Sequence, residues 1–348
     1  MSRNAKLLYA ATMAAAVVGT FQPRTVRAFT ADGLMTYDAA TRDAAGAFLV
    51  GELERLDQTL NMPLVEVTWS RDIQLREDVT IGDETASFTN TGFAAAGGPS
   101  AAGKNWAGKD ANAIKGLAIN IEKSSGPLTL WAMELAWSIP ELESAQRVGR
   151  PIDSQKVEGM ELKRQMDIDE QVYIGDEILG VTGLVNAAGV DLENVEGGDW
   201  ANPATSPDEI LADINKLLAR AWKNTGYALC PTDLLLPPLK FAVLVSRKVS
   251  DAGNMSVLEY VRLNSLSNAK NGRPLNIKPL KWLEGRGAGN TDRMVAYTND
   301  KKRVRFPMTP VQRTPLEHRS IYQMTTYLMR IGVVELVYPE TVAYADGI

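Results

Sequence analysis

Residues 140–175, PELESAQRVGRPIDSQKVEGMELKRQMDIDEQVYIG, carry the clearest helical pattern in this 348-residue sequence. Pro151 interrupts the pattern, because proline lacks the backbone N–H that a helix interior needs. From Asp153, which suits an N-cap, apolar residues recur at helical intervals with charged residues between them. Gly175 is a typical stop signal. The sequence therefore predicts a second helix of about five or six turns, roughly 30 Å long, which leads into QVYIGDEILGVTGLVN (171–186).

The sequence before this helix predicts strands on either side of a segment of small residues. Helical spacing predicts an amphipathic helix within 38–60, and alternation of apolar and polar residues predicts strands over 64–81. Residues 92–116 hold six glycines and eight alanines, which bury too little area to offset chain entropy. Strand-like alternation resumes at 117–139. The small-residue segment is therefore an excursion between strands that is either flexible or packed on something else.

The text after the long helix mixes helices and strands. A polar break at 196–206 is the best internal domain boundary, and the residues after it predict a helix that Ser206 or Thr205 caps and Pro207 begins. Further predicted elements are a buried strand with a Pro-Pro kink at 233–246, a helix at 256–265, strands at 275–285 and 293–300, and paired strands over 322–344. No βαβ rhythm repeats, so the predicted fold class is α+β.

Composition excludes most enzyme chemistry. The chain is 45% hydrophobic and 23% charged with a net charge of −5, which is typical of a globular protein and unlike one that neutralises nucleic-acid phosphates. Its single cysteine, Cys230, excludes an intrachain disulfide, and its single histidine, His318, excludes paired-histidine metal sites. His318 lies in a polar stretch that is typical of a surface loop. We expect no catalytic residue, no cofactor and no metal site.

Gly98-x-x-x-x-Gly103-Lys104 imitates a phosphate-binding loop. Asn105 stands where that loop needs Ser or Thr for magnesium, and Pro99 removes a backbone donor. No predicted strand precedes the segment and no predicted helix follows it. The residues 98–105 therefore do not predict a nucleotide site.

Three other patterns have simple explanations. The cluster GRGAGN (285–290) lacks dinucleotide-binding spacing and predicts a tight turn. The basic run Lys301, Lys302, Arg303 and Arg305 predicts a solvated face or a subunit contact rather than a nucleic-acid site. The carboxylates at a helix end lack calcium-loop spacing and predict a charged surface; they are Asp167, Asp169, Glu170, Asp176 and Glu177.

The N-terminus imitates a secretory signal, but Arg24 and Arg27 lie where a cleavage region is neutral. We interpret residues 1–30 as a basic arm with a short helix. Its apolar run is too short and too alanine-rich to span a bilayer, and the sequence predicts no membrane segment elsewhere.

In order, the chain has a basic arm, a Gly/Ala-rich excursion between strands, a long helix ending in YIG, a two-layer domain and terminal strands. This order resembles the major capsid proteins of tailed bacteriophages, the Hong Kong 97-like fold that encapsulin shells share. The most specific stretches are 171–186 and GRPLNIKPLKWLEGRGAGNTDRMVAYTND (272–300). The resemblance covers nearly the whole chain from about residue 40.

The resemblance implies a domain organisation. Residues 1–65 look like the N-terminal arm and first helix, and 66–125 like strands with an extended loop at about 80–118. Residues 126–200 with 300–348 look like a peripheral domain that carries the spine helix, and 201–299 like an axial domain. The implied function is self-assembly into hexamers and pentamers of an icosahedral head that encloses double-stranded DNA.

The resemblance also implies partners and contact residues. The partners are copies of this chain, with scaffolding, portal and cement proteins and only weak, non-specific contact with packaged DNA. The implied location is the virion, after assembly in the host cytoplasm. Some members of this fold form Lys–Asn crosslinks, for which Lys104 and Lys109 are the candidate lysines. The predicted interface residues are Phe93, Lys104, Trp106, Lys109, Arg286, Lys301, Lys302, Arg303 and Arg305.

Two other functions stay open at this point. An encapsulin-type compartment would enclose a cargo protein instead of DNA, although the basic arm favours a phage protein. A secreted binding protein or enzyme would require cleavage of the signal-like N-terminus. Closed icosahedral particles in the microscope would favour the two shell functions over the third.

Overall fold

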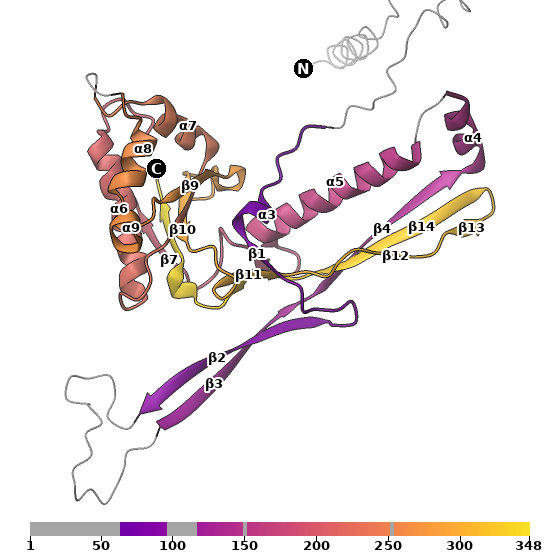
Figure 1. The fold of residues 1–348 in the computed structure, drawn as a ribbon, viewed down its shortest axis with the longest axis horizontal. Helices are drawn as coiled ribbons and strands as arrows, with labels where there is room; N and C mark the ends of the chain where they lie inside the picture. Colours follow the sequence, from indigo (N-terminus) through magenta and orange to yellow (C-terminus); the bar gives the residue numbers. More distant parts are fainter. Residues whose placement is uncertain (1–62, 96–116, 149–151, 251–253) are drawn as a thin grey trace, which may run out of the picture. The chain divides into compact units, whose positions relative to one another are not determined.

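The computed structural model describes residues 63–95, 117–148, 152–250 and 254–348 (Figure 1). The chain divides into two units, Met1–Thr59 and Leu60–Ile348, and every described residue belongs to the second. The predicted arm and the helix predicted within 38–60 therefore lie outside the described residues. The same holds for the near phosphate-binding loop at 98–105.

The long helical region forms two helices, as predicted. Helix α4 spans Ile139–Val148 and helix α5 spans Ile152–Tyr173. Helix α5 begins one residue before Asp153, so Asp153 lies in its first turn and is not the N-cap. Gly175 follows the helix with φ +81, and a Cβ there would lie 2.3 Å from the Val181 carbonyl oxygen. Only glycine fits that turn.

A five-stranded sheet forms the centre of the described fold. Its order is β7 (Asp191–Asn194), β16 (Ala343–Asp346), β10 (Arg293–Tyr297), β8 (Asp233–Leu236) and β9 (Asn276–Pro279). The outer pairs β7–β16 and β8–β9 are parallel, and the inner pairs are antiparallel. All residues of β8 and β16 are buried, which indicates that elements cover both faces of the sheet.

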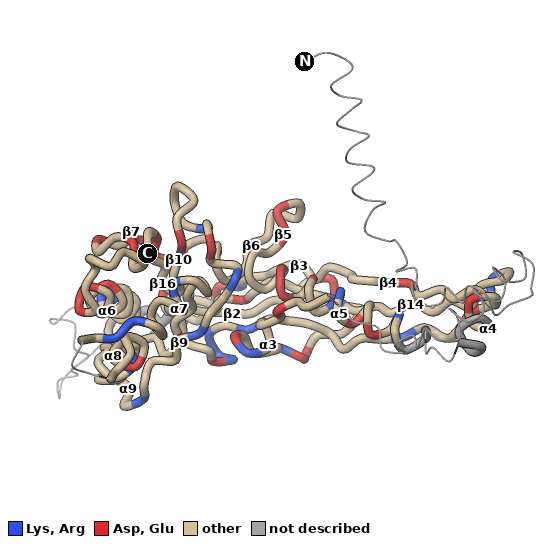
Figure 2. Tube along the Cα trace, turned by 90° about the horizontal axis from the view of Figure 1, so that it is seen from above, with Lys and Arg blue, Asp and Glu red and all other residues tan. Residues whose placement is uncertain are grey.

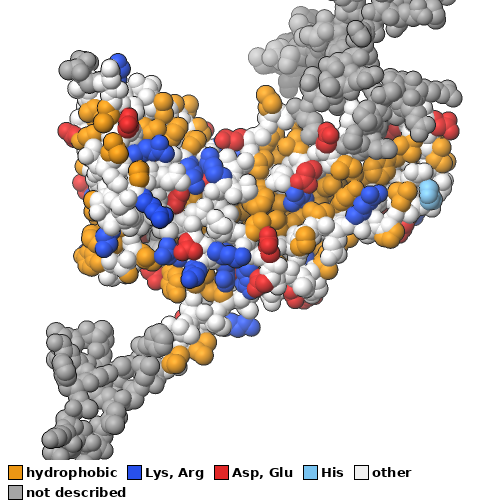
Figure 3. All heavy atoms as spheres, viewed as in Figure 1, with side chains coloured by type: hydrophobic (Ala, Val, Ile, Leu, Met, Phe, Trp, Pro, Cys, Tyr) orange, Lys and Arg blue, Asp and Glu red, His pale blue; other side chains and the backbone are white. Residues whose placement is uncertain are grey.

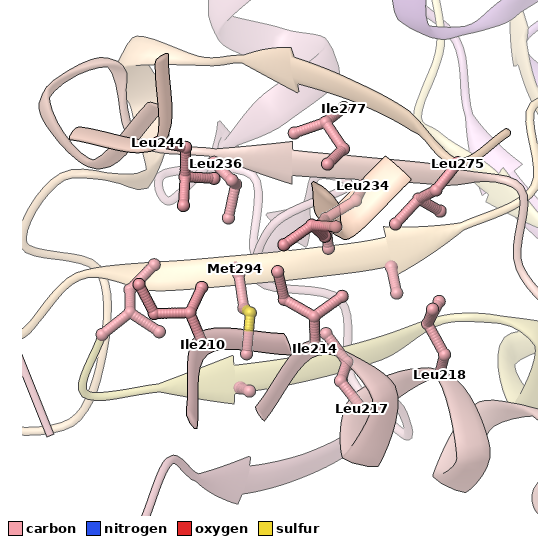
Figure 4. Close-up of a cluster of buried hydrophobic side chains, with 14 of the residues drawn as sticks. Ile210, Ile214, Leu217, Leu218, Leu234, Leu236, Leu244, Leu275, Ile277 and Met294 are labelled. Atoms are coloured by element: carbon pink, nitrogen blue, oxygen red, sulfur yellow. The ribbon is translucent and has the colours of Figure 1, made fainter. Parts of the chain in front are cut away.

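Four helices pack on one face: α6 (Pro207–Asn224), α7 (Pro238–Ser246), α8 (Val257–Asn264) and α9 (Leu266–Asn271). Figure 4 shows Ile210, Ile214 and Leu217 of α6 facing Met294 of β10. Helix α6 begins as predicted, because Ser206 and Glu209 bond each other's backbone N–H in a capping box. The side chains of alternate strand residues point to the other face of the sheet. There Leu235, Val295 and Tyr297 pack with Ile168 and Val172 of α5.

Helix α5 also packs on a second sheet. Strand β4 (Thr129–Ser138) pairs antiparallel with β14 (Tyr322–Ile331) along all ten residues. The short strands β12 (Gln312–Arg313) and β13 (Glu317–Arg319) bond the other edge of β14. Leu135 and Trp137 of β4 contact Met160 of α5. Helix α5 therefore lies along the β4–β14 pair with its first half and on the five-stranded sheet with its last turns (Figure 1).

A long hairpin flanks the predicted small-residue excursion, of which residues 96–116 lie outside the described residues. Strands β2 (Thr85–Ala95) and β3 (Leu117–Pro127) pair antiparallel over eleven residues each. Figure 1 shows this hairpin running away from the other described elements. Near its base lies a three-stranded sheet of β1 (Gln74–Arg76), β11 (Val304–Pro307) and β15 (Glu335–Leu336). A small pair, β5 (Gly175–Asp176) and β6 (Val181–Thr182), follows α5.

Three of the strand predictions were wrong in part, because helices form in those stretches. Within 64–81 the chain forms a short helix, α3 (Trp69–Asp72), and only Gln74–Arg76 is a strand. The stretch 233–246 was predicted as one strand, but helix α7 begins at Pro238, the second proline of the pair. A short apolar run suits a helix as well as a strand, and proline is favoured at the first position of a helix. The predicted strand at 275–285 ends at Pro279 and continues as a 3-10 helix, η1 (Lys281–Leu283).

The pairing predicted at the C-terminus was also wrong. Strand β14 pairs with β4, β15 with β11 and β16 with β10, so the strands within 322–344 do not pair with each other. A second 3-10 helix, η2 (Pro339–Thr341), separates β15 from β16. The connection after α5 contains strand β7, which its glycines and polar residues did not predict. His318 is exposed as predicted, but it lies in β13 and not in a loop.

Candidate assembly surfaces

The β2–β3 hairpin presents apolar side chains to solvent. Ile119 is 58% exposed and Ile121 is 65% exposed. They lie two residues apart, so both point to one face of β3. Their cross-strand neighbours are Phe93 and Thr91. A two-stranded ribbon is marginally stable by itself in water, so these exposed apolar side chains make this face a candidate contact surface.

Charged residues fix the base of the hairpin. Arg76 donates from Nη1 to the Ser87 carbonyl in β2 (3.0 Å) and to Glu335 Oε1 (2.7 Å). Arg305 donates to the other oxygen of Glu335 (2.6 Å), and its guanidinium lies 5.7 Å from the centre of the Phe88 ring. Glu335 is buried, and two arginines compensate its charge. These bonds hold the first residues of the hairpin on the β1–β11–β15 sheet.

The basic run borders a hollow beside this base. Lys302, Arg303 and Arg305 line it with Phe88, Thr89, Leu229, Asp300, Val337 and Tyr338. Lys301 and Lys302 are exposed, whereas Arg303 lies 3.5 Å from Asp300 and Arg305 is bound to Glu335. Figure 3 shows basic side chains gathering above the point where the hairpin leaves the other elements. The run therefore consists of two exposed lysines and two arginines that form ion pairs within the chain.

Arg286 lies at the tip of a braced turn. The residues 285–290 form the predicted tight turn, with positive φ at Gly285, Gly289 and Asn290. The turn is held by Ala288 N–H, which donates to Asp346 Oδ2 (2.9 Å), and Asp346 also binds Arg293. Arg286 itself is exposed. The structure thus presents this side chain to solvent on a fixed backbone.

The turn between β5 and β6 was not predicted as a contact surface. Ile178 is 95% exposed and Leu179 is 48% exposed, beside exposed Glu177. Figure 2 shows this turn projecting from the neighbouring described elements. An Ile-Leu pair between acidic residues and a glycine was the available signal, since apolar side chains in a turn lack a core to enter.

A family model described as Major capsid protein matches residues 103–348. The chain belongs to the major capsid protein family. No curated protein matches the sequence. The family agrees with the resemblance that the residues 171–186 and 272–300 carry.

Solved structures share the fold of this capsid protein at low sequence identity. The capsid of the Myoviridae phage XM1 superposes with a TM-score of 0.68 and 17% identity, covering 86% of this chain and 98% of that chain. The capsid of a native GTA particle gives 0.58 and 11%, covering 90% and 99%. The Mycobacterium phage Adephagia gives 0.54 and 12%, covering 86% and 96%. These likenesses confirm the Hong Kong 97-like α+β fold.

The prediction that the acidic cluster forms a charged surface was wrong for its central residue, Asp169. Asp169 is fully buried, and its Oδ1 accepts the backbone N–H groups of Thr68 (2.8 Å) and Trp69 (3.0 Å). Asp167 accepts the indole N–H of Trp131 (2.9 Å). Within the described ranges, no group of three or more His, Cys, Asp or Glu side chains could hold a metal ion. These carboxylates bind the protein's own donors.

The remaining predicted contact residues of this capsid protein lie beyond the described structure. Lys104, Trp106 and Lys109 fall in 96–116, and for Phe93 only the backbone of β2 is described. Their roles stay predictions. In the described part of the chain, no helix is both long and apolar enough to cross a membrane.

Proposed function

We propose that this chain is the major capsid subunit of a tailed bacteriophage and assembles as hexamers and pentamers into the icosahedral head around double-stranded DNA. The β2–β3 hairpin carries the proposal. It is a two-stranded ribbon in which the described side chains at 119–123 of β3 are exposed on both faces, with Ile119 and Ile121 on one of them. A second copy of the chain is the partner that a self-assembling shell supplies.

We further propose the division of labour that the resemblance implies. The spine helix is α5, residues 126–200 with 300–348 form the peripheral domain, and 201–299 form the axial domain. Strand β16 lies in the same sheet as β8 and β10, so the C-terminal residues tie these two domains together. In the same scheme, Arg286 and the basic run 301–305 contact neighbouring copies, as do Phe93, Lys104, Trp106 and Lys109.

A structural role without catalysis fits the charges of the described residues. The buried carboxylates Asp72, Asp169 and Glu335 are each bound to basic residues or backbone donors of the same chain. A net charge of −5 supports a shell that encloses DNA with weak contact. Scaffolding, portal and cement proteins, together with assembly in the host cytoplasm, complete the proposal.

Electron microscopy of the purified full-length protein tests this function. We expect closed icosahedral particles built of hexamers and pentamers. Monodisperse small particles over a wide range of protein concentration would refute the proposal. Particles that hold a protein cargo and no DNA in the producing cell would refute the phage head but retain the shell.

A further inference from the structure

Residues 66–73, which we call the strap, bind helix α5 through several hydrogen bonds. Asp169 Oδ1 accepts two backbone N–H groups of the strap, from Thr68 and Trp69. The Trp69 indole donates to Gln165 (2.8 Å), and the Tyr173 hydroxyl donates to Asp72 (2.7 Å). These bonds join the strap to the last three turns of α5. Burial raises the pKa of Tyr173, so this hydroxyl stays a donor.

The same eight residues also bind the five-stranded sheet and its flanking segment. The Tyr297 hydroxyl in β10 donates to the Asp72 carbonyl (2.7 Å), and Lys278 in β9 lies 3.2 Å from the Asp72 carboxylate. Lys281 in η1 donates to the Glu66 carbonyl (2.6 Å), and Arg71 donates to the Pro279 carbonyl (2.8 Å). The strap therefore forms hydrogen bonds both with helix α5 and with the five-stranded sheet and its flanking helix η1.

Helix α5 needs such a tie because it spans two separate packing surfaces. Its first half packs with Leu135 and Trp137 on the β4–β14 pair, and its last turns pack with Val295 on the five-stranded sheet. Packing of apolar side chains is non-directional and permits small rotations, whereas buried hydrogen bonds fix direction. The strap contributes these directional bonds at one end of the helix.

We propose that the strap fixes the angle between α5 and the five-stranded sheet, with Asp169 as its positioning residue, and that this angle sets the curvature at which subunits close into a shell. The first part rests on contacts within one subunit. The second part rests on the proposed function. Asp169 has this role because it joins the strap to α5 and also accepts the indole N–H of Trp282 in η1 (2.7 Å).

Two matched substitutions on α5 test the angle. Asp169→Asn puts an amide N–H₂ where one of two accepting oxygens stands, so at least one strap or indole donor loses its acceptor. Asp167→Asn is the control, because its amide oxygen still accepts the Trp131 indole and its lost ion pair is with exposed Lys163. Lys281→Met is a second test variant at a partly exposed side chain, for use if Asp169→Asn does not fold.

The subunit readouts are hydrogen exchange and a distance. In Asp169→Asn and Lys281→Met we expect the amides of Thr68 and Trp69 to exchange about tenfold faster or more. Spin labels at Glu158→Cys and Lys223→Cys, both exposed positions, in a Cys230→Ala background report the angle between α5 and α6. We expect a broader or shifted distance distribution in the test variants and the parental one in Asp167→Asn.

The outcomes separate the two parts of the proposal. Faster strap exchange with a parental distance distribution would overturn the tie, and so would unchanged strap exchange in both Asp169→Asn and Lys281→Met when both variants fold. For curvature, Asp169→Asn particles should vary in diameter while Asp167→Asn particles match the parent; equal diameters would overturn that part. If the parent forms no particles, the proposed function fails, but the exchange and distance measurements still judge the tie.

Discussion

The hairpin face makes a sharp prediction for the double substitution Ile119→Ser with Ile121→Ser. The two side chains are 58% and 65% exposed in the subunit. Fully burying an isoleucine side chain stabilises by about 1.5–3 kcal/mol. If a neighbouring copy covers the exposed share, each isoleucine contributes roughly 1–2 kcal/mol to the contact, and the pair contributes roughly 2–4 kcal/mol per hairpin.

This free energy converts directly into a protein concentration. Each 1.4 kcal/mol corresponds to a factor of ten, so the concentration needed for assembly should rise roughly 30- to 700-fold in the double variant. Light scattering against protein concentration measures this threshold. Folding should stay unchanged, because both side chains already contact water in the subunit, and urea unfolding of the unassembled chain measures that.

The matched control changes the opposite face of the same strand. Asn120 and Glu122 are exposed and alternate with the isoleucines. Asn120→Ser with Glu122→Gln exchanges polar groups for other polar groups and leaves the apolar face intact, so its assembly threshold should stay within about threefold of the parent. The reasoning is refuted if the isoleucine variant folds normally and assembles at the parental concentration, or if both variants lose assembly equally.

Three predictions concern the subunit itself. Leu217 in α6 is 1% exposed, so Leu217→Ala should lower the free energy of unfolding by about 2–5 kcal/mol. Leu239 is 70% exposed, so Leu239→Ala should change the free energy of unfolding by less than about 0.5 kcal/mol. Urea unfolding measures both variants. Gly332→Ala should cost about 1–3 kcal/mol, because its Cβ would lie 2.6 Å from Pro307 Cγ, whereas Gly126→Ala meets nothing closer than 3.8 Å. Burial raises the pKa of Asp213, so the folded chain binds a proton there more tightly than the unfolded chain, and this group adds stability as pH falls from neutrality through the raised pKa. Asp213→Asn should therefore reduce the gain in the urea midpoint as the pH is lowered from neutrality toward the ordinary aspartate pKa, and an undiminished gain would contradict this assignment.

Local signals predicted the elements that local interactions stabilise. Helix α6 was predictable to its first residue, because the capping box of Ser206 and Glu209 and the apolar face of the helix lie within one stretch of sequence. The separation of α4, which ends at Val148, from α5, which begins at Ile152, was predictable in the same way, from the proline at position 151 of the sequence. The turn at 285–290 was predictable from its glycines, whose conformational freedom the positive φ values require.

Elements stabilised by distant residues were not predictable in this way. The 64–81 stretch alternates like a strand, but α3 forms there and Asp169, about 100 residues away, accepts its first N–H groups. The parallel pairing of β7 with β16 joins residues 191–194 to 343–346, a separation that periodicity cannot report. For the candidate surfaces, the sequence located the hairpin and the basic run. Exposure of Ile178 and the bond from Arg305 to Glu335 required the tertiary structure.

Asp169 shows why the acidic cluster was misjudged and what α5 does. Three side chains two residues apart on α5 each accept an indole N–H from a different segment: Gln165 from Trp69, Asp167 from Trp131 and Asp169 from Trp282. A sequence pattern scores these residues as polar and therefore as solvent-facing. In the fold their polarity is what binds α3, β4 and η1 to one helix, since an indole N–H buried without an acceptor costs free energy. The helix therefore holds its neighbours through polar groups as well as apolar ones, since both oxygens of Asp167 and both oxygens of Asp169 accept hydrogen bonds from donors of this chain.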